Sequence, residues 1–253
     1  MKLFGKIVIG ILLYLLFMIM LFPARVAVAL MPLPSGVQLG GVSGSLWHGQ
    51  ADVLQIGSRQ LERLSWQLQP SSLFTGVVQA QWQLGSRASA VNGKGIISWS
   101  SAGIAARQLR LDAPVGFLVG NRRLPFKTVL SGDISLLLDE GHQGQPLCGG
   151  LNGKLFLNHI GLNNQFGDYP LGNMAFSLQC VKGQVQLATD DEKNAIGVAG
   201  TLLFKDQLQM EVNGRIRRTD GQSRDLQNSL GLLGKPDANG NYPLQYKGRI
   251  PGL

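Results

Sequence analysis

The stretch "LSWQLQPSSLFTGVVQAQWQL" (Leu64–Leu84) decides the fold class of this chain. At its start, leucine and tryptophan alternate with serine and glutamine, and from Val78 onward apolar side chains alternate with glutamines. A period of two residues is typical of a strand with one buried face. Because Pro70–Thr75 lies between the two alternating parts, the stretch predicts a β-hairpin.

The composition of the whole chain favours the same class. Its 253 residues allow one or two domains, and 34 glycines with only 15% charged residues are typical of many short strands and turns. We expect a mostly β fold, with a single N-terminal transmembrane helix followed by an antiparallel β-sheet domain. Further strands are predicted at Gly95–Trp99, Arg107–Asp112, Gly132–Leu138, Gly153–Leu157, Met174–Cys180, Gly183–Leu187, Gly197–Phe204, Gln207–Arg217 and Tyr242–Ile250, and short helices at Pro114–Asn121 and Leu226–Gly234.

The basic character of the chain does not indicate a nucleic-acid-binding protein. The formal net charge is +8, but basic residues cluster only at Asn121–Arg123 and Arg215–Arg218. Nucleic-acid binding needs a concentrated basic face. The scattered charges instead predict a solvated surface, or one that lies near anionic phospholipid heads.

The N-terminus carries an uncharged apolar run. Lys2 and Lys6 precede Ile7–Phe22, and Arg25 follows it. As a helix, residues 3–22 would extend about 30 Å, which matches the hydrocarbon core of a bilayer. More basic residues before the run than after it place the N-terminus in the cytoplasm and the remaining chain outside.

A cleaved signal peptide is the alternative, because Ala27–Ala29 forms an A-x-A pattern. The apolar run exceeds the usual ~7–15 residues of a signal peptide, and Arg25 lies between the run and the pattern. We therefore favour a retained anchor. The expected organisation is a cytoplasmic N-terminus and transmembrane anchor at residues 1–29 and a periplasmic β-rich domain at residues 30–253.

The two cysteines, Cys148 and Cys180, both belong to the part expected outside the cytoplasm. An oxidising compartment favours their pairing in a disulfide. Free, buried thiols that act as small apolar side chains are the alternative.

Two short patterns occur twice at nearly constant spacing. Gly40–Trp47 matches Gly149–Phe156 at an offset of 109 residues, and Leu61–Gln69 matches Leu171–Gln179 at an offset of 110. We expect an internal duplication, although a glycine-rich chain can produce such matches by chance. A repeated β unit that cannot cover its own apolar face would stack on its copy and form a continuous sheet or groove. The predicted halves are residues 36–140 and 147–253.

No pattern indicates catalysis, a metal site or a cofactor. The histidines, which lack ligand partners at suitable spacing, are His48, His142 and His159. Gly93–Ser98 is only half of a dinucleotide-binding fingerprint, and Asp237–Asn241 reads as a turn because it lacks the glutamate of a calcium loop. The adjacent acids of Asp190–Glu192 cannot pair on one strand face for acid–base work, so a solvated loop is predicted. No catalytic, cofactor-binding or metal-binding residue is assigned.

The order of features resembles a known family. An N-terminal anchor is followed by "GGVSGSLWHGQA" (Gly40–Ala51), by "LSWQLQPSSLFTG" (Leu64–Gly76), by two exported cysteines and by "GLLGKPDANGNYPLQYKGRI" (Gly231–Ile250). This order is similar to that of general secretion pathway protein N, the type II secretion system protein N family. The resemblance implies a bitopic inner-membrane protein without enzyme activity. Its implied partners are other inner-membrane and periplasmic components of the machine that moves folded proteins across the outer membrane.

A fainter similarity, an anchor followed by repeated amphipathic strands, is to the AsmA-like envelope proteins, whose β-grooves are associated with lipid movement. The alternative function is therefore binding or moving an envelope lipid. A filled apolar core would favour a protein-binding scaffold, with exposed strand edges as docking sites. An open trough lined by Leu64, Trp66, Val78 and Trp82 would favour lipid. Trp47 and Trp66 are expected to be core side chains, since an exposed tryptophan would instead suit an interface.

Overall fold

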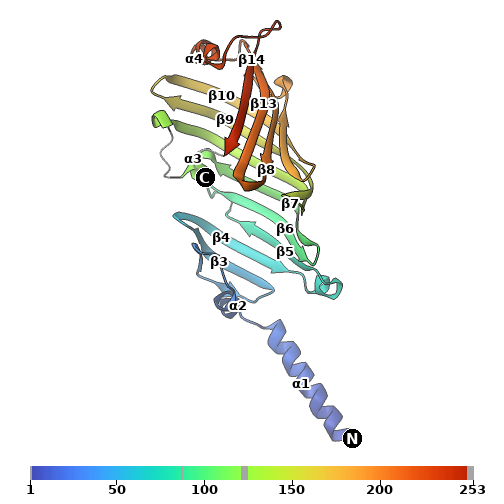
Figure 1. Cartoon of the computed structure of the whole chain (residues 1–253). Helices are drawn as coiled ribbons and strands as arrows, with labels where there is room; N and C mark the ends of the chain where they lie inside the picture. Colours follow the sequence, from blue (N-terminus) through green and yellow to red (C-terminus); the bar gives the residue numbers. More distant parts are fainter. Residues whose placement is uncertain (1, 87, 121–124, 250–253) are drawn as a thin grey trace. The chain divides into compact units, whose positions relative to one another are not determined.

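The computed structural model describes residues 2–86, 88–120 and 125–249 (Figure 1). The chain divides into two compact units, Met1–Ser101 and Ala102–Leu253. In both units the paired strands are antiparallel. The predicted mostly β, antiparallel fold is confirmed.

The first unit combines helices at its N-terminus with a sheet in the order β1-β3-β4-β5-β6. The two-residue strand β2 also pairs with β3, next to the part of β3 that pairs with β1. Its elements are α1 (Lys2–Met20), α2 (Ala24–Leu30), β1 (Val37–Gly40), β2 (Ser43–Gly44), β3 (His48–Ile56), β4 (Arg59–Leu68), the 3₁₀ helix η1 (Pro70–Thr75), β5 (Val78–Leu84) and β6 (Asn92–Ser100). In the described parts of the chain, no helix combines the length and the apolar character needed to cross a membrane.

The predicted hairpin is formed by β4 and β5, which η1 connects. Trp66 pairs with Trp82, and Leu68 pairs with Ala80. Directly opposed residues of an antiparallel pair point to the same side, so the apolar members of both strands share one face of the sheet. The glutamines and serine between them occupy the other face. A one-residue slip would exchange the two faces, which is why the alternation determines this register.

The alternation is interrupted once, at Arg63. Leu61 is buried and Leu64 is half-buried, although they are three residues apart. Arg63 between them has a φ of 50°, and the partner strand has the same spacing because Leu54 pairs with Leu61 and Ala51 with Leu64. Because Arg63 departs from the strand conformation, the side chain of Leu64 points to the same face as that of Leu61.

The second unit is a meander in which β7 to β14 pair in chain order (Figure 1). Its strands are β7 (Gly103–Pro114), β8 (Val129–Gln143), β9 (Cys148–Asn164), β10 (Gly167–Val181), β11 (Gln184–Thr189), β12 (Val198–Lys205), β13 (Gln209–Arg217) and β14 (Asn241–Arg249). Its helices are α3 (Val115–Val119), α4 (Arg224–Ser229) and the 3₁₀ turns η2 (Pro125–Lys127), η3 (Asp191–Lys193), η4 (Asp206–Leu208) and η5 (Leu230–Leu233).

Irregular positions bend the three longest strands at neighbouring points. The register between β8 and β9 shifts beside Gly132, and the register between β9 and β10 shifts beside Gly172. Gly132, His159 and Gly172 all have positive φ values, of 104°, 51° and 69°. Such bulges increase local twist. They allow strands of 15 to 17 residues to curve while they stay paired.

One face of this second sheet is apolar across many strands. A row of opposed partners on this face runs Leu138, Gly153, Leu178, Leu187, Leu202 and Val212. The adjacent row on the opposite face runs Lys154, Ser177, Ala188, Thr201 and Asn213. Most members of the apolar row are half-buried rather than fully buried.

Helical segments cover one end of the apolar face. Val115 of α3 packs with Ile160, Met174 and Ile196, and Leu226 of α4 lies against the same cluster. A second cluster contains Ile216, Leu230 and Tyr242. Ser223 caps α4, since its Oγ accepts a hydrogen bond from the N–H of Leu226 at 3.3 Å.

The nine additional predicted strands correspond to β6 to β14, although Gln207 lies in η4 rather than in β13. The two predicted short helices correspond to α3 and to α4 with η5. Ile250 and the basic cluster at Asn121–Arg123 lie outside the described residues. Sequence patterns did not identify α2 or β1 to β3. The two glycine motifs differ locally: Gly41 and Gly44 have φ values of 65° and 86° beside β2, whereas Gly150 and Gly153 lie within β9. Trp66 and Phe176 nevertheless both lie on the apolar face of their sheets. The duplication stays a prediction.

Candidate functional site

The most specific sequence motif joins the end of α1 to the first sheet. Trp47, at 9% exposure, donates a hydrogen bond from Nε1 to the carbonyl of Ile19 at 2.9 Å. The N–H of Leu46 donates to the carbonyl of Phe22 at 2.8 Å. Carbonyls in the last turn of a helix lack partners within the helix. The Ile19 carbonyl also accepts a hydrogen bond from the N–H of Phe22 at 3.3 Å, and the Trp47 indole adds the contact that ties the helix end to the sheet.

The short helix α2 strengthens this junction. Ala24 is fully buried and packs with Val42 and Ala51. Arg25 donates from Nε to the carbonyl of Val42 at 2.6 Å. The prediction that Trp47 is a core side chain is confirmed, and its polar contact with α1 was not predicted.

The glycines of the motif are required by close approaches. A Cβ at Gly44 would lie 2.4 Å from the carbonyl oxygen of His48, and a Cβ at Gly49 would lie 2.2 Å from the Trp66 ring. Trp66 in turn donates from Nε1 to the carbonyl of Leu46 at 3.1 Å. The Gly-x-Leu-Trp-x-Gly pattern thus provides both the space and the hydrogen bonds that the junction needs.

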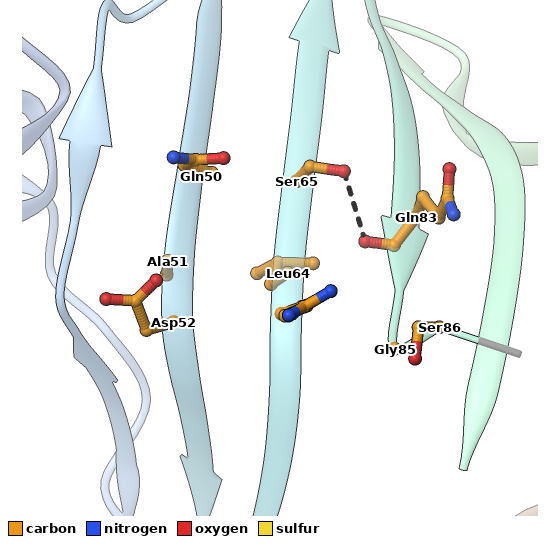
Figure 2. A pocket seen from close by; sticks show the side chains of 9 residues that line it. Gln50, Ala51, Asp52, Leu64, Ser65, Gln83, Gly85 and Ser86 are labelled. Carbon is orange, nitrogen blue, oxygen red and sulfur yellow. Dashed lines mark hydrogen bonds between the residues drawn. The ribbon is translucent and has the colours of Figure 1, made fainter. Parts of the chain in front are cut away.

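A polar depression of about 440 Å³ lies on the first sheet (Figure 2). It is lined by Gln50, Ala51, Asp52, Arg63, Leu64, Ser65, Gln83, Gly85 and Ser86. Gln50, Ser65 and Gln83 are opposed partners on neighbouring strands, and Ser65 Oγ donates to the carbonyl of Gln83 at 3.5 Å. The lining has one carboxylate and no histidine, so it offers polar contacts but no paired acid and base.

The three histidines, to which no role was assigned from the sequence, lie apart in the described structure. His48 begins β3, His159 lies in β9, and His142 is 3.9 Å from Glu140 Oε2. Within the described ranges, no group of three or more His, Cys, Asp or Glu residues is arranged to hold a metal ion.

The acidic loop at η3 forms separate ion pairs. The Lys193 ammonium lies 2.6 Å from Asp190 Oδ2, and Arg217 Nε lies 3.2 Å from Asp191 Oδ2. The hydrogen bond from Lys193 holds the pKa of Asp190 below its usual value. The two neighbouring carboxylates therefore bind different cations.

The segment Asp237–Asn241, which was predicted as a turn, forms a turn in the structure. Asp237 Oδ1 accepts hydrogen bonds from the backbone N–H groups of Asn239 at 2.8 Å and Asn241 at 2.9 Å. The bond from Asn241 is the main reason that the pKa of Asp237 lies below its ordinary value. The carboxylate thus stabilises the turn that leads into β14.

The outer edge of β14 offers little backbone for strand addition. Asn241 directs both its N–H and its carbonyl to Asp237 rather than to β13. Alternate residues of an antiparallel strand face the same edge, so Pro243, which has no N–H, faces outward as well. The Arg249 carbonyl accepts a hydrogen bond from the Tyr246 hydroxyl at 2.8 Å. Between Pro243 and Arg249, only two residues that face the outer edge still offer both an N–H and a carbonyl group to another strand. This protects the edge against pairing with a further strand.

Cys148 and Cys180 form the predicted disulfide, which joins the start of β9 to the end of β10. The N–H groups of Leu147 and Cys148 both donate to the carbonyl of Gly183 at 3.0 and 3.2 Å. A Cβ at Gly183 would lie 2.2 Å from the carbonyl oxygen of Gln145. The disulfide and the close approach at Gly183 hold the loop before β9 against the loop after β10.

Replacing Cys180 by serine should lower the free energy of unfolding by about 2–4 kcal/mol, because the cross-link restricts the unfolded chain. Denaturant titration under non-reducing conditions measures this loss. Cys148→Ser should give the same loss, and the double variant no more than either single one. Equal stability of the wild type and both single variants would contradict a structural role of the bond.

Comparison with known proteins identifies the family. The profile described as type II secretion system (T2SS), protein N, matches residues 35–245. The chain belongs to this family. Type II secretion system protein N of Aeromonas hydrophila is 32% identical over 240 residues, covering 94% of both chains. The protein of the same name from Vibrio cholerae serotype O1 is 25% identical over 229 residues, covering 90% of this chain and 91% of its own.

The match to type II secretion system protein N begins after α2 and ends within β14, so it includes strands of both units. The resemblance inferred from the motifs is confirmed. The comparison with solved structures gave no significant match.

Proposed function

We propose that this chain is a non-enzymatic accessory component of the type II secretion machine. Residues 1–29 hold it in the inner membrane, and residues 30–253 act in the periplasm through contacts with other components. Family membership supports a place in the secretion machinery. The other parts of the proposal rest on the N-terminal segment and on its junction with the sheet.

The N-terminal segment supports membrane anchoring through its exposed apolar surface. Residues 7–22 carry no charge, and large side chains of α1 from Phe4 to Met20 are exposed. Exposing a helix that is apolar on all sides to water is unfavourable, and a lipid environment removes this cost.

The observation that carries the proposal is the junction at Trp47. Because its indole binds the Ile19 carbonyl, the first sheet is held directly at the end of α1. A domain held this close to a membrane meets other membrane-bound components at a raised effective concentration. Anchoring thus favours weak protein contacts that free diffusion would not maintain.

The test is secretion by cells that lack this chain. A folded exported protein should accumulate in the periplasm, and the full chain supplied from a plasmid should restore its release. Undiminished secretion without the chain would refute the role as an accessory component. Trp47→Ala should restore secretion less well than the wild type at equal protein level, and Leu232→Ala, which changes a side chain of 88% exposure in the second unit, is the matched control.

A second candidate function, lipid binding, is favoured by the incompletely covered apolar faces. Leu64, Trp66 and Trp82 are half-buried, and Val78 is 42% exposed. If the full chain releases stoichiometric phospholipid on extraction, and Trp66→Ala removes the lipid without unfolding the protein, lipid binding replaces the scaffold role. Absence of bound phospholipid in protein extracted with mild detergent supports the scaffold.

A further inference from the structure

The turn between β4 and β5 presents an aromatic side chain almost completely to solvent. Phe74 of η1 is 94% exposed, and its neighbour Leu73 is 45% exposed. Leaving a phenylalanine side chain in water rather than burying it loses hydrophobic stabilisation. At this exposure the Phe74 ring adds little to the packing of the first unit.

The turn that carries this ring is rigid. Ser72 Oγ donates to the carbonyl of Gln69 at 2.7 Å, and Thr75 Oγ1 donates to the carbonyl of Ser72 at 2.8 Å. The N–H of Gly76 donates to the carbonyl of Leu73 at 3.0 Å, and the φ of Gly76, 72°, ends the 3₁₀ turn. A side chain on such a turn loses little conformational freedom when it binds.

The stretch that carries the turn has no charged residue, and exposed apolar side chains lie on the strands beside it. Val78, the first residue of β5, is 42% exposed and is the cross-strand partner of Trp99, which is 66% exposed. Ile97 on the same face is 39% exposed. From residue 64 to residue 86 the sequence contains no Lys, Arg, Asp or Glu. The surface around Phe74 therefore matches an apolar, uncharged surface rather than a charged one.

We propose that Phe74 is the anchor of a docking site, inserted into an apolar pocket with an uncharged rim on another protein of the secretion machine. This inference rests on the proposed function and identifies the face of the chain that performs it. Buried aromatic anchors dominate the energy of many interfaces, with weaker contacts around them that exclude water. Leu73, Val78 and Trp99 are placed to form that surrounding ring.

The charge-free surface argues for a protein pocket rather than a membrane surface. Segments that lie on anionic membranes combine aromatic rings with Lys or Arg, which gain energy from the lipid headgroups. No basic residue accompanies Phe74 between residues 64 and 86. One rigid ring gains most when a complementary pocket already exists on its partner.

The test places a photo-crosslinking amino acid at Ser71, an exposed residue of η1, in the full chain within cells. The control position is Ser58, an exposed residue in the turn between β3 and β4. We expect Ser71, but not Ser58, to give an adduct with a component of the secretion machine. The adduct should be absent from a strain that lacks the other components, and its yield should not fall when the salt concentration is raised.

Phe74→Ser should reduce the yield at position 71 by about 10- to 100-fold, which corresponds to about 1.4–2.8 kcal/mol. The melting temperature of the Phe74→Ser variant should equal that of the wild type. Phe74→Leu should recover part of the crosslinking yield. Leu232→Ser, which changes a side chain of 88% exposure in the other unit, is the matched control and should have no effect.

Three outcomes would overturn the inference: a phospholipid adduct, an adduct between two copies of this chain, or an adduct yield that Phe74→Ser leaves unchanged. The failure of this inference is distinguishable from failure of the proposed function. If removal of the chain blocks secretion while Phe74→Ser secretes normally, only the docking site is wrong. If removal of the chain has no effect on secretion, the proposed function itself fails.

Discussion

Trp66→Ala should lower the free energy of unfolding of the protein by about 3–5 kcal/mol, because it leaves a cavity and an unpaired carbonyl. The Trp66 ring fills the space above Gly49, pairs across the hairpin with Trp82 and donates to the carbonyl of Leu46. A loss of this size is a large part of the ~5–15 kcal/mol that keeps a typical protein folded. Denaturant titration of the detergent-solubilised full chain measures it.

Trp66→Phe is the matched control for this substitution. It keeps a smaller ring on the apolar face and removes the indole donor, so the loss should be clearly smaller than for alanine. Secretion should fall in proportion to the amount of folded Trp66→Ala protein, since the change removes packing and no chemistry. An unfolding midpoint equal to that of the wild type would show that the ring does not stabilise the hairpin.

The second large effect concerns the membrane. We expect the full chain to stay with the membrane fraction after washing at alkaline pH, and a reporter that is active only outside the cytoplasm to be active when fused after Leu253. We expect the exposed apolar side chains of α1 to provide this retention. Replacing Leu12 and Leu16, two exposed side chains in the middle of α1, by aspartate should shift most of the chain out of the washed membranes.

The matched control replaces Ser58 and Gln60, exposed residues outside the helix, by aspartate and should leave retention unchanged. Mass spectrometry of the extracted chain should show residues 1–29 still attached. A soluble species that begins at Leu30 would replace the anchor by a cleaved signal peptide.

The strands were predictable because each one is a local pattern. The hairpin at Leu64–Leu84 needs only a two-residue period and a turn, and the structure has both. The short strands β1 and β2 were missed because four and two residues cannot display a period. The helix α2 was missed because its alanine-rich sequence also fits a cleavage site.

The candidate site was only partly predictable for a different reason. The sequence motif at Gly40–Gly49 is recognisable, but the partner of Trp47 is the Ile19 carbonyl, 28 residues away, and backbone carbonyls leave no mark in a sequence. The exposure of Phe74 was also hidden. A phenylalanine next to a leucine in an apolar hairpin is as well suited to a core as to a surface.

The sequence by itself determined the strand class, the register of the central hairpin, the pairing of Cys148 with Cys180 and the family of the chain. These features depend on alternation, on residue identity and on motif order, which are properties of the chain alone. The tertiary structure decided which side chains are left outside, which edge of a sheet is blocked and where a helix end meets a sheet. Those features depend on contacts between segments far apart in the sequence, and burial is set by the whole packed surface rather than by any one residue.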